Sequence, residues 1–406
     1  LKMNFFYTKY ISSSLVQHLF NTVFFPYFTI ILMSQRLSLD LWGEIIFIQA
    51  IAGFFLLFLN MGIEFHGTNR IASLDQRDNK IVGEYNFIKI TNVIFILLFG
   101  YILVFAGLLP ERIFLMSVIL SASISFNPSW VFLVEKNIPP IIFIEIIFRS
   151  IFLIFIFLYV VDDVKGSYYV YFLAGNNFLI ALFSHLYLKI KYTYSVLVKT
   201  NYFSMVKKLS GLFFYQISGI STMMLPVLIL GLLSDFRTVA IFGNADKLFK
   251  GLRGLFSPLT RIAITLFSRK VDETKENQTK LFSIIFVTGA LLILILLGFS
   301  SYLITFLLGE KYADSVHVFN ILIISIPFIW SYNFLVGSYF IPKKLETLIT
   351  KYNVLLLLIS SFLIPISILL FEESGLSLSI LLIEFLLFTL LLKRFIKKDY
   401  IKKFND

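Results

Sequence analysis

The ionisable residues best placed to do chemistry lie inside an apolar stretch at positions 238–262. They are Asp246, Lys247, Lys250, Arg253 and Arg261. At about 100° per residue, a helix places all five within an arc of about 120° and leaves the rest of its surface apolar. Ionisable groups inside a bilayer are costly and usually face a cavity or a partner. This stripe therefore predicts a cationic cavity that favours an anionic cargo.

A second interpretation of the same stretch stays open. The segment would then be a helix on the inner surface of the membrane, with its basic face on lipid headgroups. The number of apolar runs and the alternation of charge in the connections favour the membrane-spanning interpretation.

Glu145 and Arg149 are spaced i,i+4 in another apolar stretch. In one interpretation the two residues neutralise each other and only pack. In the other, Arg149 adds to the cargo site and Glu145 titrates. A proton or sodium gradient would then drive the cycle, with Asp246 or Glu145 as the coupling carboxylate. Glu384 has no partner at i±4, and we expect it to pack peripherally beside a polar neighbour.

The composition argues against other site chemistries. The chain has no cysteines, which excludes disulfides, thiolate nucleophiles and cysteine metal sites. Its four histidines form no ligand pair at helical spacing, and the sequence carries no phosphate-binding loop or hydrolase motif. The net charge of +11 lies largely in connections between apolar runs, so it indicates a membrane protein rather than nucleic-acid binding. We therefore expect no enzyme activity, no metal and no cofactor.

Membrane-spanning helices are the elements expected to position these residues. The mean hydropathy is +0.87, and only 15% of residues are charged, against about a quarter in soluble chains. A spanning helix needs ~20 mostly apolar residues, and the sequence predicts about twelve such spans. They cover 11–33, 41–63, 91–109, 113–134, 138–161, 168–188, 211–233, 238–262, 281–307, 316–341, 353–371 and 376–392.

The spans predict an all-α integral membrane fold with two six-helix bundles around a central cationic cavity. The N-terminal bundle covers 1–205 and the C-terminal bundle covers 206–406. The polar connections at about 64–90 and 189–210 have room for short interfacial helices. Lys and Arg gather in alternate connections, which places both termini in the cytoplasm.

Several short stretches resemble the Wzx-type O-antigen and polysaccharide flippases, whose superfamily also contains multidrug extruders and lipid II flippases. The stretches are Phe24–Phe28 with Leu41–Ile45 and Gln49–Ala50, Gly62 with Gly67–Ala72, Trp130–Lys136, Ala245–Lys247, and Leu308–Tyr312. The chain departs from the family pattern at Asn69–Arg70 and at Leu133–Val134, which puts in doubt any role transferred to those positions.

The resemblance implies a flippase of O-antigen and lipopolysaccharide biosynthesis in the bacterial cytoplasmic (inner) membrane. Its cargo would be an undecaprenyl-pyrophosphate-linked oligosaccharide, carried from the inner to the outer leaflet. Lys247, Lys250, Arg253, Arg261 and Arg149 would bind the pyrophosphate. The implied partners are membrane lipids and the polymerase and chain-length regulator of the same pathway, without nucleic acid.

Two other functions remain open. A multidrug or cation antiporter of the same superfamily would prefer an acidic lining, whereas the stripe here is basic. An O-antigen polymerase would carry a long outside loop with arginines, and the predicted outside connections of this chain are short.

Overall fold

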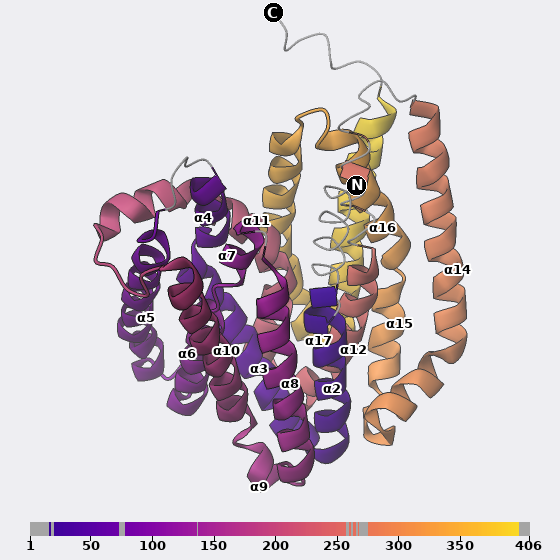
Figure 1. Cartoon of the computed structure of the whole chain (residues 1–406). Coiled ribbons are helices and arrows are strands. Elements are labelled where there is room, and N and C mark those ends of the chain that lie inside the picture. The colour runs from indigo at the N-terminus through magenta and orange to yellow at the C-terminus, as the bar shows by residue number, and fades with distance from the viewer. Residues whose placement is uncertain are drawn as a thin grey trace, which may run out of the picture. The chain divides into compact units, whose positions relative to one another are not determined.

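The computed structural model describes residues 16–17, 20–72, 78–135, 137–256, 260, 263–264, 267 and 275–397. Within these ranges the chain forms helices joined by turns, with no strand (Figure 1). The predicted all-α fold class is therefore confirmed for the part of the chain that the structure covers.

The chain divides into two compact units, residues 1–228 and 229–406. The boundary between them lies within α11 (Tyr202–Leu233). The arrangement of two six-helix bundles around a cavity stays a prediction, and each unit is described by itself.

The first unit is built from helices that overlap the predicted spans, although the helix predicted at 91–109 begins at Ile81, inside the predicted connection 64–90. They are η1 (Phe20–Phe24), α2 (Phe25–Arg36), α3 (Leu39–Asn60), α4 (Ile63–Ala72), α5 (Ile81–Phe105), α6 (Glu111–Ser125), α7 (Ser129–Val134), α8 (Pro139–Tyr159), α9 (Asp163–Gly166), α10 (Tyr169–Tyr192) and the greater part of α11. Its centre is formed by α6, which packs against α3, α5 and α10. On its other side, α10 packs against α8.

Local residues explain where several of these helices begin and end. Ser38 caps α3, since its hydroxyl accepts from the backbone N–H of Leu41. Met61 and Gly62 then turn the chain into α4, both with positive φ. Gly62 is required there for a second reason: a Cβ would lie 2.6 Å from Cβ of Leu212. Pro128 separates α6 from α7, as proline cannot continue the hydrogen-bond ladder.

The second unit contains the last residues of α11, then α12 (Phe236–Leu255), α14 (Lys275–Leu308), η2 (Glu310–Tyr312), α15 (Ser315–Ile323), α16 (Ile326–Leu335), η3 (Val336–Phe340) and α17 (Glu346–Ile396). α15 and α16 pack against α12, α14 and α17. In the most apolar stretch of 18 residues within Ser315–Phe340, 72% of the residues are buried inside the protein. In the most apolar stretch of the same length within α14, 6% are buried. The α15–η3 segment is therefore the core of this unit.

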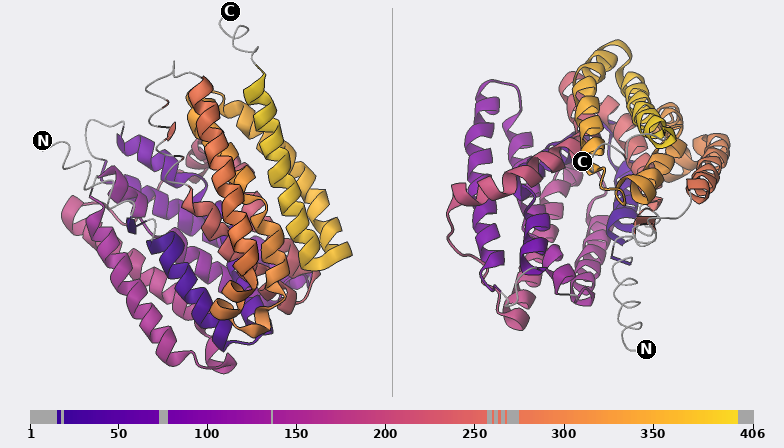
Figure 2. Two further views of the ribbon diagram at one scale, coloured as in Figure 1. Left: turned by 90° about the vertical axis from the view of Figure 1, so that its right-hand side faces the viewer. Right: turned by 90° about the horizontal axis from the view of Figure 1, so that it is seen from above.

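The helix α17 consists of two helices that fold back on each other (Figure 2). The reversal occurs at Phe371 and Glu372, whose backbone angles are not helical. The two arms approach each other closely, and the Ser379 hydroxyl of the second arm donates to the Ser367 hydroxyl of the first at 2.7 Å. A Cβ on Gly375 would lie 2.0 Å from the Ser367 carbonyl oxygen. These arms confirm the predicted break between the spans 353–371 and 376–392.

Eight helical segments of the described chain are long and apolar enough to cross a membrane. Each of the twelve predicted ranges overlaps a helix, although the first predicted span is described only in part. Many of their leucine, isoleucine and phenylalanine side chains point outward, where a bilayer would solvate them. The chain is a multi-pass membrane protein.

Candidate functional site

The helix α12 carries most of the charged residues expected at the site. It starts at its cap Asp235, whose carboxylate accepts from the backbone N–H of Thr238 at 2.8 Å. Hydrogen bonds from the hydroxyl and the backbone N–H of Thr238 lower the pKa of this exposed carboxyl. The following residues up to Ala245 are all buried, and the helix packs against α15, α16 and α17. The charged stripe is therefore held in a rigid frame within the second unit.

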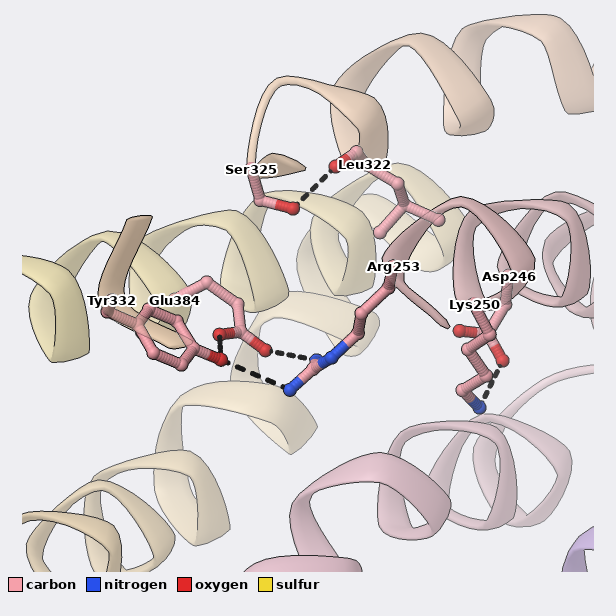
Figure 3. Close-up of polar contacts among 7 residues, drawn as sticks. All are labelled: Asp246, Lys250, Arg253, Leu322, Ser325, Tyr332 and Glu384. Atoms are coloured by element: carbon pink, nitrogen blue, oxygen red, sulfur yellow. Dashed lines mark hydrogen bonds and ion pairs between the residues drawn. The ribbon is translucent and has the colours of Figure 1, made fainter. Parts of the chain in front are cut away.

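Arg253 forms a closed ring of polar contacts with two other helices (Figure 3). Its Nη1 lies 2.5 Å from Oε1 of Glu384 on α17. Its Nη2 donates to the Tyr332 hydroxyl on α16 at 3.1 Å, and that hydroxyl donates to Glu384 Oε2 at 2.8 Å. The Arg253 and Glu384 side chains are 20% and 12% exposed, so the charges are largely removed from solvent. Such a pair fixes the relative position of three helices.

A second ion pair lies within α12 itself. The Lys250 ammonium is 2.5 Å from Oδ2 of Asp246, one helical turn earlier (Figure 3). Asp246 is buried, while Lys250 is partly exposed. Lys247 lies beside them and is also only partly exposed. Predicted site residue Arg261 lies outside the described residues.

The predicted cationic stripe on α12 therefore includes basic residues that are paired with carboxylates. Lys250 and Arg253 each have a carboxylate partner, and a buried carboxylate such as Asp246 or Glu384 needs a counter-charge in a bilayer. Glu384, which we expected to pack peripherally, is the partner of Arg253. The signal in the sequence was a single glutamate inside an apolar span, and nothing local to it indicated which basic residue it meets.

Glu145 occupies a different environment in the first unit. It is buried, and three side-chain amides donate to its carboxylate: Gln17 at 2.9 Å, Asn21 at 2.6 Å and Asn127 at 3.2 Å. These amides come from the start of the chain and from the break between α6 and α7. We did not single out Gln17 or Asn21 from the sequence, although both are amides within the first apolar span.

Arg149 does not pair with Glu145, despite the i,i+4 spacing on α8. Its guanidinium instead lies over the ring of Phe25, 4.4 Å from the ring centre. Within the described ranges it makes no ion pair, and its Nε is buried without a hydrogen-bond partner. Glu145 and Arg149 thus have different close partners and form no direct ion pair, although the Glu145 charge still acts on the guanidinium. Arg149 therefore differs from Lys250 and Arg253 in making no ion pair with a described carboxylate.

The described residues hold no group of three or more His, Cys, Asp or Glu side chains able to bind a metal ion. The charged residues instead form two separate sets. One set, around Glu145 and Arg149, belongs to the first unit. The other, on α12 with Glu384 and Tyr332, belongs to the second.

No family model matches the sequence, and no curated protein matches it significantly. Solved structures do match it. One is titled "Lipid II flippase MurJ, inward closed conformation", with a TM-score of 0.71 at 13% identity, covering 95% of this chain and 87% of that one.

Another is the inward-facing conformation of a multidrug resistance MATE family transporter of the MOP superfamily. Its TM-score is 0.63 at 12% identity, covering 93% of this chain and 94% of that one. At such low identity the likeness shows the fold alone. The chain therefore shares the membrane-protein fold of a lipid II flippase and a multidrug transporter.

Proposed function

We propose that this chain is a flippase that moves an undecaprenyl-pyrophosphate-linked oligosaccharide, such as an O-antigen repeat unit, across the bacterial cytoplasmic membrane. The observation that carries the proposal is the likeness to a lipid II flippase over 95% of the chain. Basic residues within apolar helices add to it, because an anionic lipid-linked cargo needs cations where it enters the bilayer.

Arg149 is the residue to which we assign the first contact with the pyrophosphate. A guanidinium recognises phosphate oxygens through two parallel hydrogen bonds. Arg149 is already oriented by its stack on Phe25, and no described carboxylate forms an ion pair with it. Lys247, Lys250, Arg253 and Arg261 are the proposed contacts from the second unit.

The carboxylates give this proposal its means of coupling. Asp246 and Glu145 are the coupling carboxylates that we propose for a proton or sodium gradient. Asp246 neutralises Lys250, and Glu384 neutralises Arg253, so phosphate must replace a carboxylate at either cation. Protonating Asp246 or Glu384 removes that competitor and leaves the cation available to the cargo. We therefore add Glu384 to the residues of the site.

A second candidate is a drug or cation antiporter. It is favoured by the likeness to a MATE transporter and by the three largely buried carboxylates Glu145, Asp246 and Glu384. In that case the carboxylates would bind the cargo, and the basic residues would only hold them in place.

Deleting the gene in its own host separates the candidates. The flippase proposal expects lipid-linked repeat units to accumulate on the inner leaflet, with loss of surface polymer. Restoring the wild-type gene should return the polymer. Single unpolymerised repeat units at the surface would point to a polymerase instead. An unchanged polysaccharide profile with new sensitivity to cationic drugs would contradict the flippase and support the antiporter.

A further inference from the structure

A run of lysines lies where α10 ends and α11 begins. The five are Lys189, Lys191, Lys199, Lys207 and Lys208. Between positions 164 and 234 the sequence contains no Asp or Glu. The end of α10 is also the end of a candidate membrane span, Asp163–Tyr192. The lysines are thus concentrated at the margin of a spanning segment.

The connection that carries them is held firmly against the first unit. The backbone N–H of Ser195 donates to the Asn79 carbonyl at 2.8 Å, and the Asn86 amide donates to the Val196 carbonyl at 2.8 Å. The Tyr194 hydroxyl donates to Glu135 at 2.7 Å. These contacts present the lysines on an ordered surface rather than on an unattached loop.

The first turns of α11 are amphipathic and lie across the ends of neighbouring helices (Figures 1 and 2). Their inner face places Met205 and Leu209 in a hydrophobic cluster with Tyr85 of α5 and Trp130 of α7. Their outer face carries Lys207 and Lys208, both exposed, together with Phe203, which is 80% exposed. A helix of this kind is typical of a membrane interface.

The described part of the chain offers no ion pair to the charge of this surface. None of the five lysines forms an ion pair with a described residue. The nearby acidic groups are engaged elsewhere: Asp78 and Glu84 bind Arg70, and Glu135 accepts from Tyr194. The charge of the surface is therefore available to an anionic partner from outside the described chain.

We propose that this surface binds the headgroups of anionic phospholipids. We call it the α10–α11 basic surface and define it by the five lysines with Ile190, Leu197 and Phe203. The apolar members are strongly exposed, with Ile190 at 82% and Phe203 at 80%. A soluble anion would leave them in water, whereas a lipid binds the lysines through its phosphate and covers the apolar side chains with its acyl chains. This inference does not depend on the identity of the cargo.

The test uses the full-length protein in nanodiscs of phosphatidylcholine with or without phosphatidylglycerol. Labelling by an amine-reactive reagent should be several-fold slower at Lys191, Lys199, Lys207 and Lys208 when phosphatidylglycerol is present. Each lysine near an anionic membrane surface strengthens the binding of the protein to that surface about fivefold. Salt screens this electrostatic attraction, so high salt should remove the protection of the lysines from labelling. Inorganic phosphate added to pure phosphatidylcholine discs should give no protection.

Substitution gives the second measurement. Changing Lys191, Lys199, Lys207 and Lys208 together to Gln should abolish the rise in Tm caused by phosphatidylglycerol, and changing them to Arg should preserve it. In the matched control, four exposed lysines of the second unit are changed to Gln: Lys344, Lys351, Lys393 and Lys397. This control variant should still show the rise in Tm caused by phosphatidylglycerol.

Two results would overturn the inference. One is equal labelling of the wild-type lysines in both kinds of disc. This measurement needs no variant, so it stands even if the Gln variant does not fold. The other is protection by inorganic phosphate alone, which would identify a soluble anion as the ligand.

Discussion

At the scale of single residues, the second unit contains ion pairs that lie among apolar helices. Arg253 meets Glu384 and Tyr332, and each of the three comes from a different helix. Removing one member of a buried pair leaves the other without compensation, which costs more than replacing both by apolar residues. Arg253 and Glu384 are therefore expected to behave as a unit in measurements of stability.

We expect Glu384→Leu to destabilise the protein by about 3–5 kcal/mol, since the Arg253 charge loses its partner. The double variant Arg253→Met with Glu384→Leu should recover most of that loss. Thermal unfolding of the purified proteins measures both. Equal destabilisation by the single and the double variant would show that the pair does not hold the helices together.

Arg149 is expected to matter for transport more than for stability, because it makes no ion pair within the described chain. Arg149→Gln should lower the rescue of surface polysaccharide at least tenfold, a loss of about 1.4 kcal/mol or more. Arg149→Lys should retain part of the activity, as it keeps the charge but not the paired hydrogen bonds.

The matched control for Arg149 is Arg112→Gln, at an exposed arginine whose contact with Glu44 is 3.8 Å long. It should rescue normally. Normal rescue by Arg149→Gln, shown to reach the membrane, would remove Arg149 from the proposed site.

At the scale of elements, two of the stretches that resemble the flippase family meet in space. Gly67 of α4 lies directly against Trp130 of α7, and a Cβ there would be 2.6 Å from the ring. Tyr85 of α5 packs edge-on against the same ring and contacts His66 through its hydroxyl at 2.5 Å. In this protein these stretches form a junction of three helices together with Tyr85 of α5.

Gly67→Ala is expected to destabilise the first unit by about 1–3 kcal/mol through overpacking against Trp130. Trp130→Phe removes the far end of the indole, so the double variant should recover part of the loss. A thermal unfolding cycle of the wild type, both single variants and the double variant measures the coupling. If the losses of stability in the two single variants add up to the loss in the double variant, Gly67 and Trp130 are not energetically coupled.

At the scale of the whole molecule, the direction of insertion follows from the distribution of Lys and Arg. The absence of cysteine makes it easy to test, since any single cysteine introduced is the only thiol. We expect Ser204→Cys to react with a membrane-impermeant reagent only from the cytoplasmic side. Val164 lies within α9 and is 77% exposed, and Val164→Cys should react only from the opposite side. Labelling of both from one side would refute the predicted topology.

The sequence by itself determined the class of the protein and the places where helices lie. Hydropathy is a property of a local run of about twenty residues, so it can be read without knowing what packs against it. The same reasoning located the break between the two arms of α17, and it also located the charged stripe of α12. That the stripe extends as far as Arg261 stays a prediction, because this residue lies outside the described ranges.

Only the tertiary structure decided which charges meet. Arg253 and Glu384 are 131 positions apart, and Glu145 is 124 positions from Asn21. No local spacing encodes such pairs, because they arise when distant helices pack. The i,i+4 spacing of Glu145 and Arg149 left a self-neutralising pair open as one interpretation, but the two side chains form no ion pair. Three amides donate to Glu145 instead, and Arg149 lies over the Phe25 ring. Local periodicity thus fixes the face on which a charge lies, and packing selects its partner.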